Sequence, residues 1–242
     1  MGKKKSFFIV IFLLTSGCLK NPQAGKINPG QREKIYLFSG IITKNTVWDG
    51  IIQIDDDLLI PKGVKLIIQP GTKIKIKEKD SSKNEPLFLS PYNEILIRGK
   101  IIARGEVNNP IIFYGEGKSM DGIFWAGIIL DQAEDGIFNF CKIQNAFTGI
   151  DSLKSSPVIE ENIFEKNKYA FVSSGEISYP KIAKNVIREN YAGFYGIFSS
   201  RGELTGNWIE NNEEEGIFIG IKSNLILKGN NFSGNKYDVR QE

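Results

Sequence analysis

The sequence contains no histidine among its 242 residues, and it has only two cysteines and two methionines. Without an imidazole, a Ser-His-Asp or Cys-His catalytic arrangement and every zinc or copper site built on histidine are excluded. The small number of sulfur ligands argues against a soft-metal site. The groups left for chemistry are carboxylates, amides, hydroxyls, basic groups and aromatic rings.

A surplus of basic residues is also missing once the first 17 residues are set aside. Residues 1–17 hold three lysines and no acidic residue, so 28 of the 31 Lys and Arg stay with the rest of the chain, against 28 Asp and Glu. Binding a polyphosphate backbone needs basic residues clustered on one face. The composition therefore predicts no nucleic-acid partner, whereas its 41% hydrophobic content is enough for a folded core.

The N-terminal residues have the pattern of an export signal. Lysines at positions 3–5 precede a short apolar run from Ser6 to Leu14, far below the roughly 20 residues that span a bilayer. Residues 15–18 read Thr-Ser-Gly-Cys and resemble the lipobox of bacterial lipoproteins, although Leu14 lies one place further from the cysteine than is usual. The resemblance implies cleavage after residue 17 and acylation of Cys18, with ordinary signal cleavage as the alternative. We expect an exported lipoprotein anchored in the membrane, at the outer membrane, its periplasmic side or the cell surface, with residues 18–35 as anchor and linker.

A motif of about 22 residues repeats through the second half of the chain. Each copy reads apolar-x-x-Asn-x-apolar-x-x-Asn, and the first asparagines of successive copies are 23, 22 and 23 residues apart. A weaker copy begins at Phe138, with Cys141 and Ala146 in the asparagine positions. Short runs of Ile, Val and Phe between Asn and Gly are typical of strands and turns. The repeated asparagines are Asn162, Asn167, Asn185, Asn190, Asn207, Asn212, Asn230 and Asn235.

This repeat resembles that of the right-handed parallel β-helix proteins of the pectate-lyase-like superfamily. The resemblance implies an all-β solenoid of roughly eight to nine turns, in which asparagine side chains stack from turn to turn. We expect one such domain over residues 36–242, with a cap over 36–59 and the clearest repeats over 138–239. Because asparagine tolerates the left-handed backbone region, we expect the repeated asparagines to form the corners. Lyases of the superfamily use acidic calcium ligands and a basic proton acceptor, and no Lys or Arg here matches that role.

The strand that follows each corner offers a candidate binding surface. Alternation along it predicts one row of inward residues, Ile128, Ile150, Phe171, Phe194 and Ile217. The outward row is then Ile129, Asp151, Val172, Tyr195 and Phe218. An apolar, partly aromatic row on a rigid sheet suits sugar-ring stacking or a protein partner. A covering loop, or a pleat shifted by one residue, is the alternative explanation.

Two carboxylates on these strands give a candidate catalytic pair. Asp131 and Asp151 are expected as diagonal neighbours on adjacent turns, where such residues lie roughly 7 to 8 Å apart. Carboxylates that cleave glycosides are about 5 to 9.5 Å apart. The alternatives are two solvated side chains, or a calcium site over Asp131–Asp135, and we expect no other cofactor. The sequence thus favours an anchored module that binds an envelope polysaccharide or protein, with a polysaccharide lyase or glycoside hydrolase as the alternative.

Overall fold

A computed structural model describes residues 35–80 and 89–242. The expected export signal, the lipidation site Cys18 and nearly all of the expected linker lie outside these residues. The described residues contain strands and turns but no helix, and hence no helix that could span a membrane.

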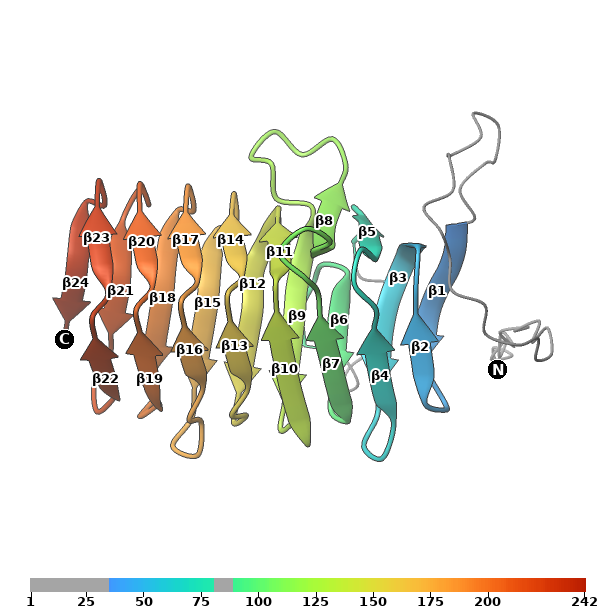
Figure 1. Cartoon of the computed structure of the whole chain (residues 1–242), viewed down its shortest axis with the longest axis horizontal. Coiled ribbons are helices and arrows are strands. Elements are labelled where there is room, and N and C mark those ends of the chain that lie inside the picture. The colour runs from blue at the N-terminus through green and yellow to red at the C-terminus, as the bar shows by residue number, and fades with distance from the viewer. Residues whose placement is uncertain (1–34, 81–88) are drawn as a thin grey trace. The chain divides into compact units, whose positions relative to one another are not determined.

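The paired strands are all parallel and lie on three faces around one axis (Figure 1). We name these face 1, face 2 and face 3. Face 1 holds the first half of β3 (Ile51–Ile60), followed by β5 (Lys73–Lys77), β8 (Ile111–Glu116), β11 (Cys141–Gln144), β14 (Ile163–Glu165), β17 (Val186–Arg188), β20 (Trp208–Glu210) and β23 (Asn231–Ser233). Face 2 holds the second half of β3, then β6 (Glu94–Ile97), β9 (Trp125–Asp131), β12 (Ala146–Leu153), β15 (Tyr169–Ser174), β18 (Ala192–Ile197), β21 (Glu215–Ile219) and β24 (Tyr237–Gln241), while β1 (Ile35–Ile41) pairs with β3. Face 3 holds β2 (Thr46–Trp48), β4 (Lys65–Ile68), β7 (Lys100–Arg104), β10 (Asp135–Asn139), β13 (Val158–Glu160), β16 (Lys181–Ala183), β19 (Arg201–Thr205) and β22 (Asn224–Lys228).

Each coil of the chain contributes to face 3, then to face 1 and then to face 2. The strand β3 turns from one face to the next, because Ile51–Ile54 pair with β5 and Leu58–Ile60 pair with β6. Face 3 has eight strands, one for each coil, in agreement with the expected number of turns. Residues 36–59 were expected to form a cap. They supply β1, β2 and most of β3, which pair in parallel like the other strands; β2 and β3 belong to the first of the eight coils, and β1 pairs with β3 on the edge away from β5 and β6.

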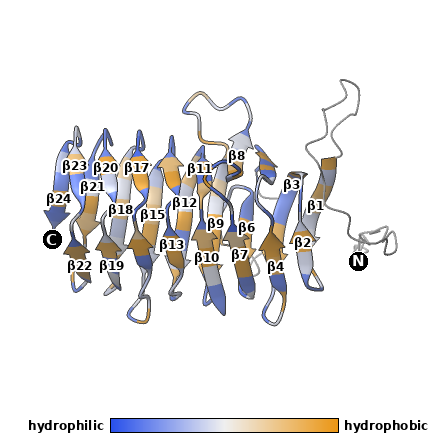
Figure 2. Ribbon diagram, viewed as in Figure 1, coloured by the Kyte–Doolittle hydropathy of each residue, from blue (hydrophilic) through white to orange (hydrophobic). Residues whose placement is uncertain are grey.

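The core consists of side chains that repeat their position in every coil. The five residues expected to point inward from face 2 are all buried, and Phe171 stacks on Phe194 with 5.3 Å between ring centroids. Phe164, Ile187 and Ile209 form the corresponding buried column on face 1. Apolar residues lie mainly on the strands and hydrophilic ones at the turns (Figure 2). The predicted alternation is therefore confirmed.

The coil bends at the residue before each repeated asparagine. Glu161 and Lys184 have φ angles of 59° and 54°, and Gly206 and Gly229 occupy the same place with 64° and 59°. The expectation that the asparagines themselves adopt the left-handed conformation is wrong. Their side chains point along the stack of coils instead, where they bond to the next coil.

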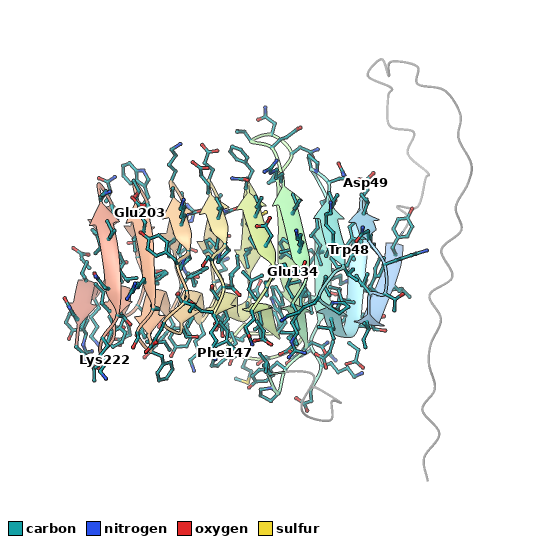
Figure 3. All side chains as sticks on the ribbon, turned by 90° about the horizontal axis from the view of Figure 1, so that it is seen from below. Trp48, Asp49, Glu134, Phe147, Glu203 and Lys222 are labelled. Atoms are coloured by element: carbon teal, nitrogen blue, oxygen red, sulfur yellow. The ribbon has the colours of Figure 1, made fainter. Side chains whose placement is uncertain are left out.

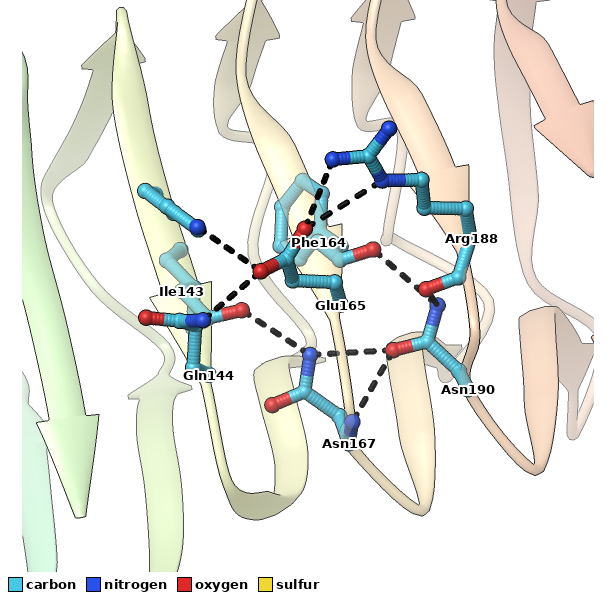
Figure 4. A network of polar contacts seen from close by, with 8 residues as sticks. Ile143, Gln144, Phe164, Glu165, Asn167, Arg188 and Asn190 are labelled. Carbon is cyan, nitrogen blue, oxygen red and sulfur yellow. Dashed lines mark hydrogen bonds and ion pairs between the residues drawn. The ribbon is translucent and has the colours of Figure 1, made fainter.

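Two ladders of amide side chains join the coils. The Nδ2 of Asn185 donates to Asn207 Oδ1 and to the carbonyl of Ile159, both at 3.0 Å. Its Oδ1 accepts from the backbone N and the Nδ2 of Asn162, at 2.8 and 3.0 Å. The second ladder, which runs from Asn167 through Asn190 and Asn212 to Asn235, repeats this pattern (Figure 4). The stacking of asparagines predicted from the sequence is therefore present.

The weak repeat copy is in register with these ladders. The backbone N–H of Cys141 donates to Asn162 Oδ1 at 2.8 Å, and that of Ala146 donates to Asn167 Oδ1 at 3.0 Å. Both residues are buried, so each ladder begins on a small side chain rather than on an unpaired amide.

Replacing Asn185 with alanine should destabilise the domain by about 2 to 4 kcal/mol, because the Ile159 carbonyl and the Asn162 N–H lose their partner in a buried position. Urea unfolding measures the loss. Asn231→Ala is the matched control, since Asn231 is exposed and its side chain bonds to no described residue; we expect it to change stability by less than about 0.5 kcal/mol. Equal losses in both variants would show that the ladder contributes nothing specific.

Candidate functional site on face 2

The outward residues of face 2 form the expected column, but they are less exposed than the sequence predicted. The register does place Ile129, Asp151, Val172, Tyr195 and Phe218 in one column, one residue per coil. The last four are half-buried. Ile129 is only 7% exposed, because it packs outside the sheet against the leucines of two preceding coils, Leu59 and Leu96. The expectation that Ile129 is open to a ligand is therefore wrong.

Asp131 is held by a cation. It lies diagonally to Asp151, as predicted, since Asp151 pairs with Ile129 and Asp131 pairs with Leu153. The Nε of Arg98 donates to Asp131 Oδ2 at 2.7 Å, and Asp131 is only 8% exposed. These contacts favour a structural role for Asp131 over the predicted catalytic one.

Asp151 lies in less polar surroundings. Its Oδ1 is buried and bonds to no described residue. Burial, with a smaller contribution from the Glu94 carboxylate, raises the pKa of Asp151 to about 6. Glu94 is fully buried and accepts hydrogen bonds from the backbone N–H groups of Leu89 and Ser90, at 2.9 and 2.8 Å. The acidic group that acts on Asp151 is thus Glu94, which was not among the carboxylates predicted from the sequence.

In the segment predicted to bind calcium, Asp131–Asp135, two of the carboxylates bond to different parts of the protein. Asp131 bonds to Arg98, and the Glu134 carboxylate accepts from the backbone N–H of Gly63 at 3.0 Å. Within residues 35–80 and 89–242, no three His, Cys, Asp or Glu side chains are grouped so that they could hold a metal ion. Calcium binding at Asp131–Asp135 is an untested prediction.

Face 1 carries a buried carboxylate, Glu165, whose oxygens both accept hydrogen bonds from neighbouring side chains. Glu165 accepts from Lys142 Nζ and Gln144 Nε2, both at 2.7 Å, and from Arg188 Nη2 at 3.0 Å (Figure 4). Burial opposes ionisation of Glu165, but the hydrogen bonds from Lys142 and Arg188 outweigh it and lower the pKa. Such a carboxylate stabilises the stack and is not available as an acid or base.

Six aromatic side chains form a continuous row across the outward side of face 2. We name this row the aromatic strip: Tyr92, Phe147, Tyr169, Tyr191, Tyr195 and Phe218. Neighbouring ring centroids in it are 4.8 to 6.4 Å apart. Phe147 lies on the opposite side of the view from Glu203 of face 3 (Figure 3). The other rings lie in or just before strands of face 2 as well.

The exposed rings of the strip are not the two predicted from the sequence. Tyr195 and Phe218 stack with an interplanar angle of 25°, so each covers one face of the other. Tyr92, Phe147 and Tyr191 are 43%, 36% and 42% exposed. A signal for part of the strip was present, because Phe147, Tyr169 and Tyr191 follow one another at steps of 22 residues. The predicted outward row did not include these three residues because it was defined by alternation after the Gly or Ala in the middle of each strand, and they lie before that point.

Charged groups fix the orientation of the rings. Lys168 Nζ lies 4.7 Å from the centroid of the Phe147 ring. The hydroxyl of Tyr195 donates to Glu215 Oε2 at 2.5 Å, and Arg240 Nη1 donates to Glu215 Oε1 at 3.1 Å. Burial, together with this bond to Glu215, raises the pKa of Tyr195. The rings are thus held in place before any ligand binds.

A hollow of about 540 Å³ adjoins the strip at the corner between face 1 and face 2. Tyr191 of the strip lines it, together with Lys168, which contacts the Phe147 ring. Polar side chains supply most of the remaining wall, namely Asp121, Asn145, Lys166, Asn167, Glu189 and Glu213. An aromatic wall with several hydrogen-bonding groups suits a ligand that has both C–H faces and hydroxyls.

Asp151→Asn should flatten the dependence of stability on pH. The pKa of Asp151 is raised in the folded state, so the folded state is favoured while the carboxyl is protonated and loses stability as the pH rises from about 4 through about 6. In the variant, the free energy of unfolding should fall by up to about 3 kcal/mol less over this pH range than in the wild type. Urea unfolding at about pH 4.5 and pH 7.5 measures it, with the exposed Asp49→Asn as control. Parallel curves for wild type and Asp151→Asn would contradict the raised pKa.

The comparisons with known proteins concern the fold. The family described as "Right handed beta helix region" matches residues 38–195 and, overlapping them, residues 119–239. Searches among curated proteins and among solved structures gave no match. The matched residues include nearly all of the parallel strands that form the three faces. The chain therefore belongs to the right-handed β-helix family.

Proposed function

We propose that this chain is a polysaccharide-binding module of the cell envelope, which holds an extended glycan along the aromatic strip. The observation that carries the proposal is the strip of six rings beside a polar hollow. Sugar rings offer C–H faces that pack on aromatic rings, and hydroxyls that bond to amide, carboxylate and ammonium groups. Both kinds of contact are available here within one surface.

The repeat of the solenoid suits a ligand that is itself a repeating chain. Successive coils rise by about 4.8 Å, so a polymer that runs along the axis meets one or two rings of the strip on each coil from β12 to β21. Since the rings are already fixed by Lys168, Glu215 and one another, little side-chain freedom is lost on binding. A protein partner could use the same rings, but the polar hollow favours a ligand rich in hydroxyls.

A second candidate function is glycoside hydrolysis, and the raised pKa of Asp151 is the observation that favours it. A carboxyl with a pKa of about 6 is partly protonated near neutral pH and can act as a general acid. Glu94, whose charge acts on Asp151, is fully buried and accepts hydrogen bonds from two backbone N–H groups, so it suits the role of tuning Asp151 rather than that of the second carboxylate that such a reaction requires. This candidate therefore depends on Asp151 as the acid.

Replacing Phe147 and Tyr191 together with alanine should weaken binding to the cognate polysaccharide roughly tenfold or more, because two exposed stacking surfaces are removed. Affinity electrophoresis against neutral and uronic-acid envelope polysaccharides measures the change. The matched control is Trp208→Ala, since Trp208 is 56% exposed but lies on face 1.

Equal retention of the double variant and the wild type would overturn the proposed use of the strip. The same samples are assayed for new reducing ends. Release of reducing ends without an unsaturated product, which stops with Asp151→Asn while binding persists, would establish the hydrolase instead.

We further propose that the chain is exported and anchored by acylation of Cys18, on the basis of the sequence pattern at residues 1–18. The full chain, produced in a bacterial host that processes lipoproteins, should partition into the detergent phase of a Triton X-114 extract. Cys18→Ser should move it to the aqueous phase, because one acyl chain or more is then absent. Unchanged partition would exclude lipidation as the cause.

A further inference from the structure

Three large apolar side chains protrude from one corner of the solenoid, where the chain passes from face 2 to face 3. Ile177, Phe198 and Ile221 follow the strands β15, β18 and β21 and are 67%, 75% and 68% exposed. They lie on three successive coils, so they form one row, which we name the apolar corner. No part of it belongs to the aromatic strip.

The backbone at Phe198 holds this exposed position at a conformational cost. Phe198 and Ser199 have φ angles of 52° and 63°, a left-handed region that bulky residues rarely occupy. The neighbouring loops are bonded to one another, as Arg201 N donates to Ser178 O at 3.1 Å and Asn224 N donates to Ser200 O at 2.9 Å. The protrusion of Phe198 is therefore built into the stacked loops.

Basic side chains surround the apolar corner. Lys154, Lys181, Arg201 and Lys222 are exposed and form no ion pair with any residue in the described part of the chain. The four loops at this corner, residues 154–157, 175–180, 198–200 and 220–223, hold Lys154, Lys222 and one acidic residue, Glu176, and Lys181 and Arg201 begin the strands that follow two of them. Acidic groups lie at both ends of the row, where Glu134 and Asp135 line a hollow with Lys154 and Ile177, and Glu242 N donates to Ile219 O. By contrast with the four basic residues of the corner, Lys228 and Arg240 elsewhere on the same coils are paired with glutamates. Cations without an ion-pair partner in the described residues thus lie next to exposed hydrocarbon along the middle of the row.

We propose that the apolar corner docks on an anionic lipid bilayer. Protruding aliphatic and aromatic tips enter the boundary between headgroups and acyl chains, and lysines around them contact the lipid phosphates. The tips carry no polar atoms that could bond to sugar hydroxyls, and the unpaired cations select an anionic partner over a neutral one. Lys222 and Phe147 lie along the same side in Figure 3, and the lipid surface and the aromatic strip share no residue.

The test is co-sedimentation of the full chain with vesicles. All proteins carry Cys18→Ser, so no acyl chain contributes, and the apolar run at residues 6–14 is the same in every sample. The vesicles are phosphatidylcholine alone, or phosphatidylcholine mixed with phosphatidylglycerol. The chain should bind the mixed vesicles more strongly, and added salt should weaken this binding.

Two double variants separate the contributions. Phe198→Ser with Ile221→Ser should reduce the bound fraction on mixed vesicles roughly tenfold, and Lys154→Gln with Lys222→Gln should remove the preference for phosphatidylglycerol. Trp208→Ser is the matched control and should bind like the wild type, and melting temperatures confirm that every variant is folded. Equal binding of the serine double variant and the wild type, or no preference for the anionic vesicles, would overturn the proposal. Retention by an acidic protein but not by vesicles would overturn it too, and would assign the corner to a protein partner.

Discussion

The structure depends on hydrogen bonds that each coil can complete only with the next one. Asn185 donates its amide to both neighbouring coils and accepts from the preceding one, and the backbone of every internal strand likewise bonds to the strands on both sides. Because buried amides without partners are costly, the corner spacing is nearly fixed at 22 or 23 residues in the ladder region. Extra length is accommodated where no ladder exists, as between β5 and β6 and between β8 and β9.

This fixed spacing determines how surfaces arise. A side chain that recurs after one coil becomes part of a column, and neighbouring columns can have quite different chemistry. On face 1, the charge of Glu165 is balanced by its ion pairs with Lys142 and Arg188 on the neighbouring coils. On face 2, the aromatic strip combines rings with hydrogen-bonding groups. Between face 2 and face 3, the apolar corner combines exposed hydrocarbon with lysines that form no ion pair with any described residue. Two binding surfaces can therefore lie on one side of a narrow solenoid without sharing residues.

The sequence predicted what depends on short-range periodicity. The inward rows, the outward column and the stacked asparagines follow from alternation along a strand and from the 22-residue step. The exposure of the outward side chains did not follow from this periodicity. Ile129, for example, is covered by Leu59 and Leu96, which come from coils without a visible sequence repeat. The groups that act on the two aspartates could not be predicted from the sequence either. Arg98 lies 33 residues before Asp131, and Glu94, whose charge acts on Asp151, follows a long insertion. These contacts depend on which outward side chains meet in space, and no local pattern encodes that.

The ladders also determine how far a local defect spreads along the solenoid. Asn185 bonds to Asn162 and Ile159 on the preceding coil and to Asn207 on the following one. In a stack of nearest-neighbour contacts, the loss of such a residue weakens the two interfaces that it bridges and leaves the other interfaces as they are. The rings of the aromatic strip are spread over several coils. A defect at one interface therefore separates the neighbouring rings there and leaves the rest of the strip intact.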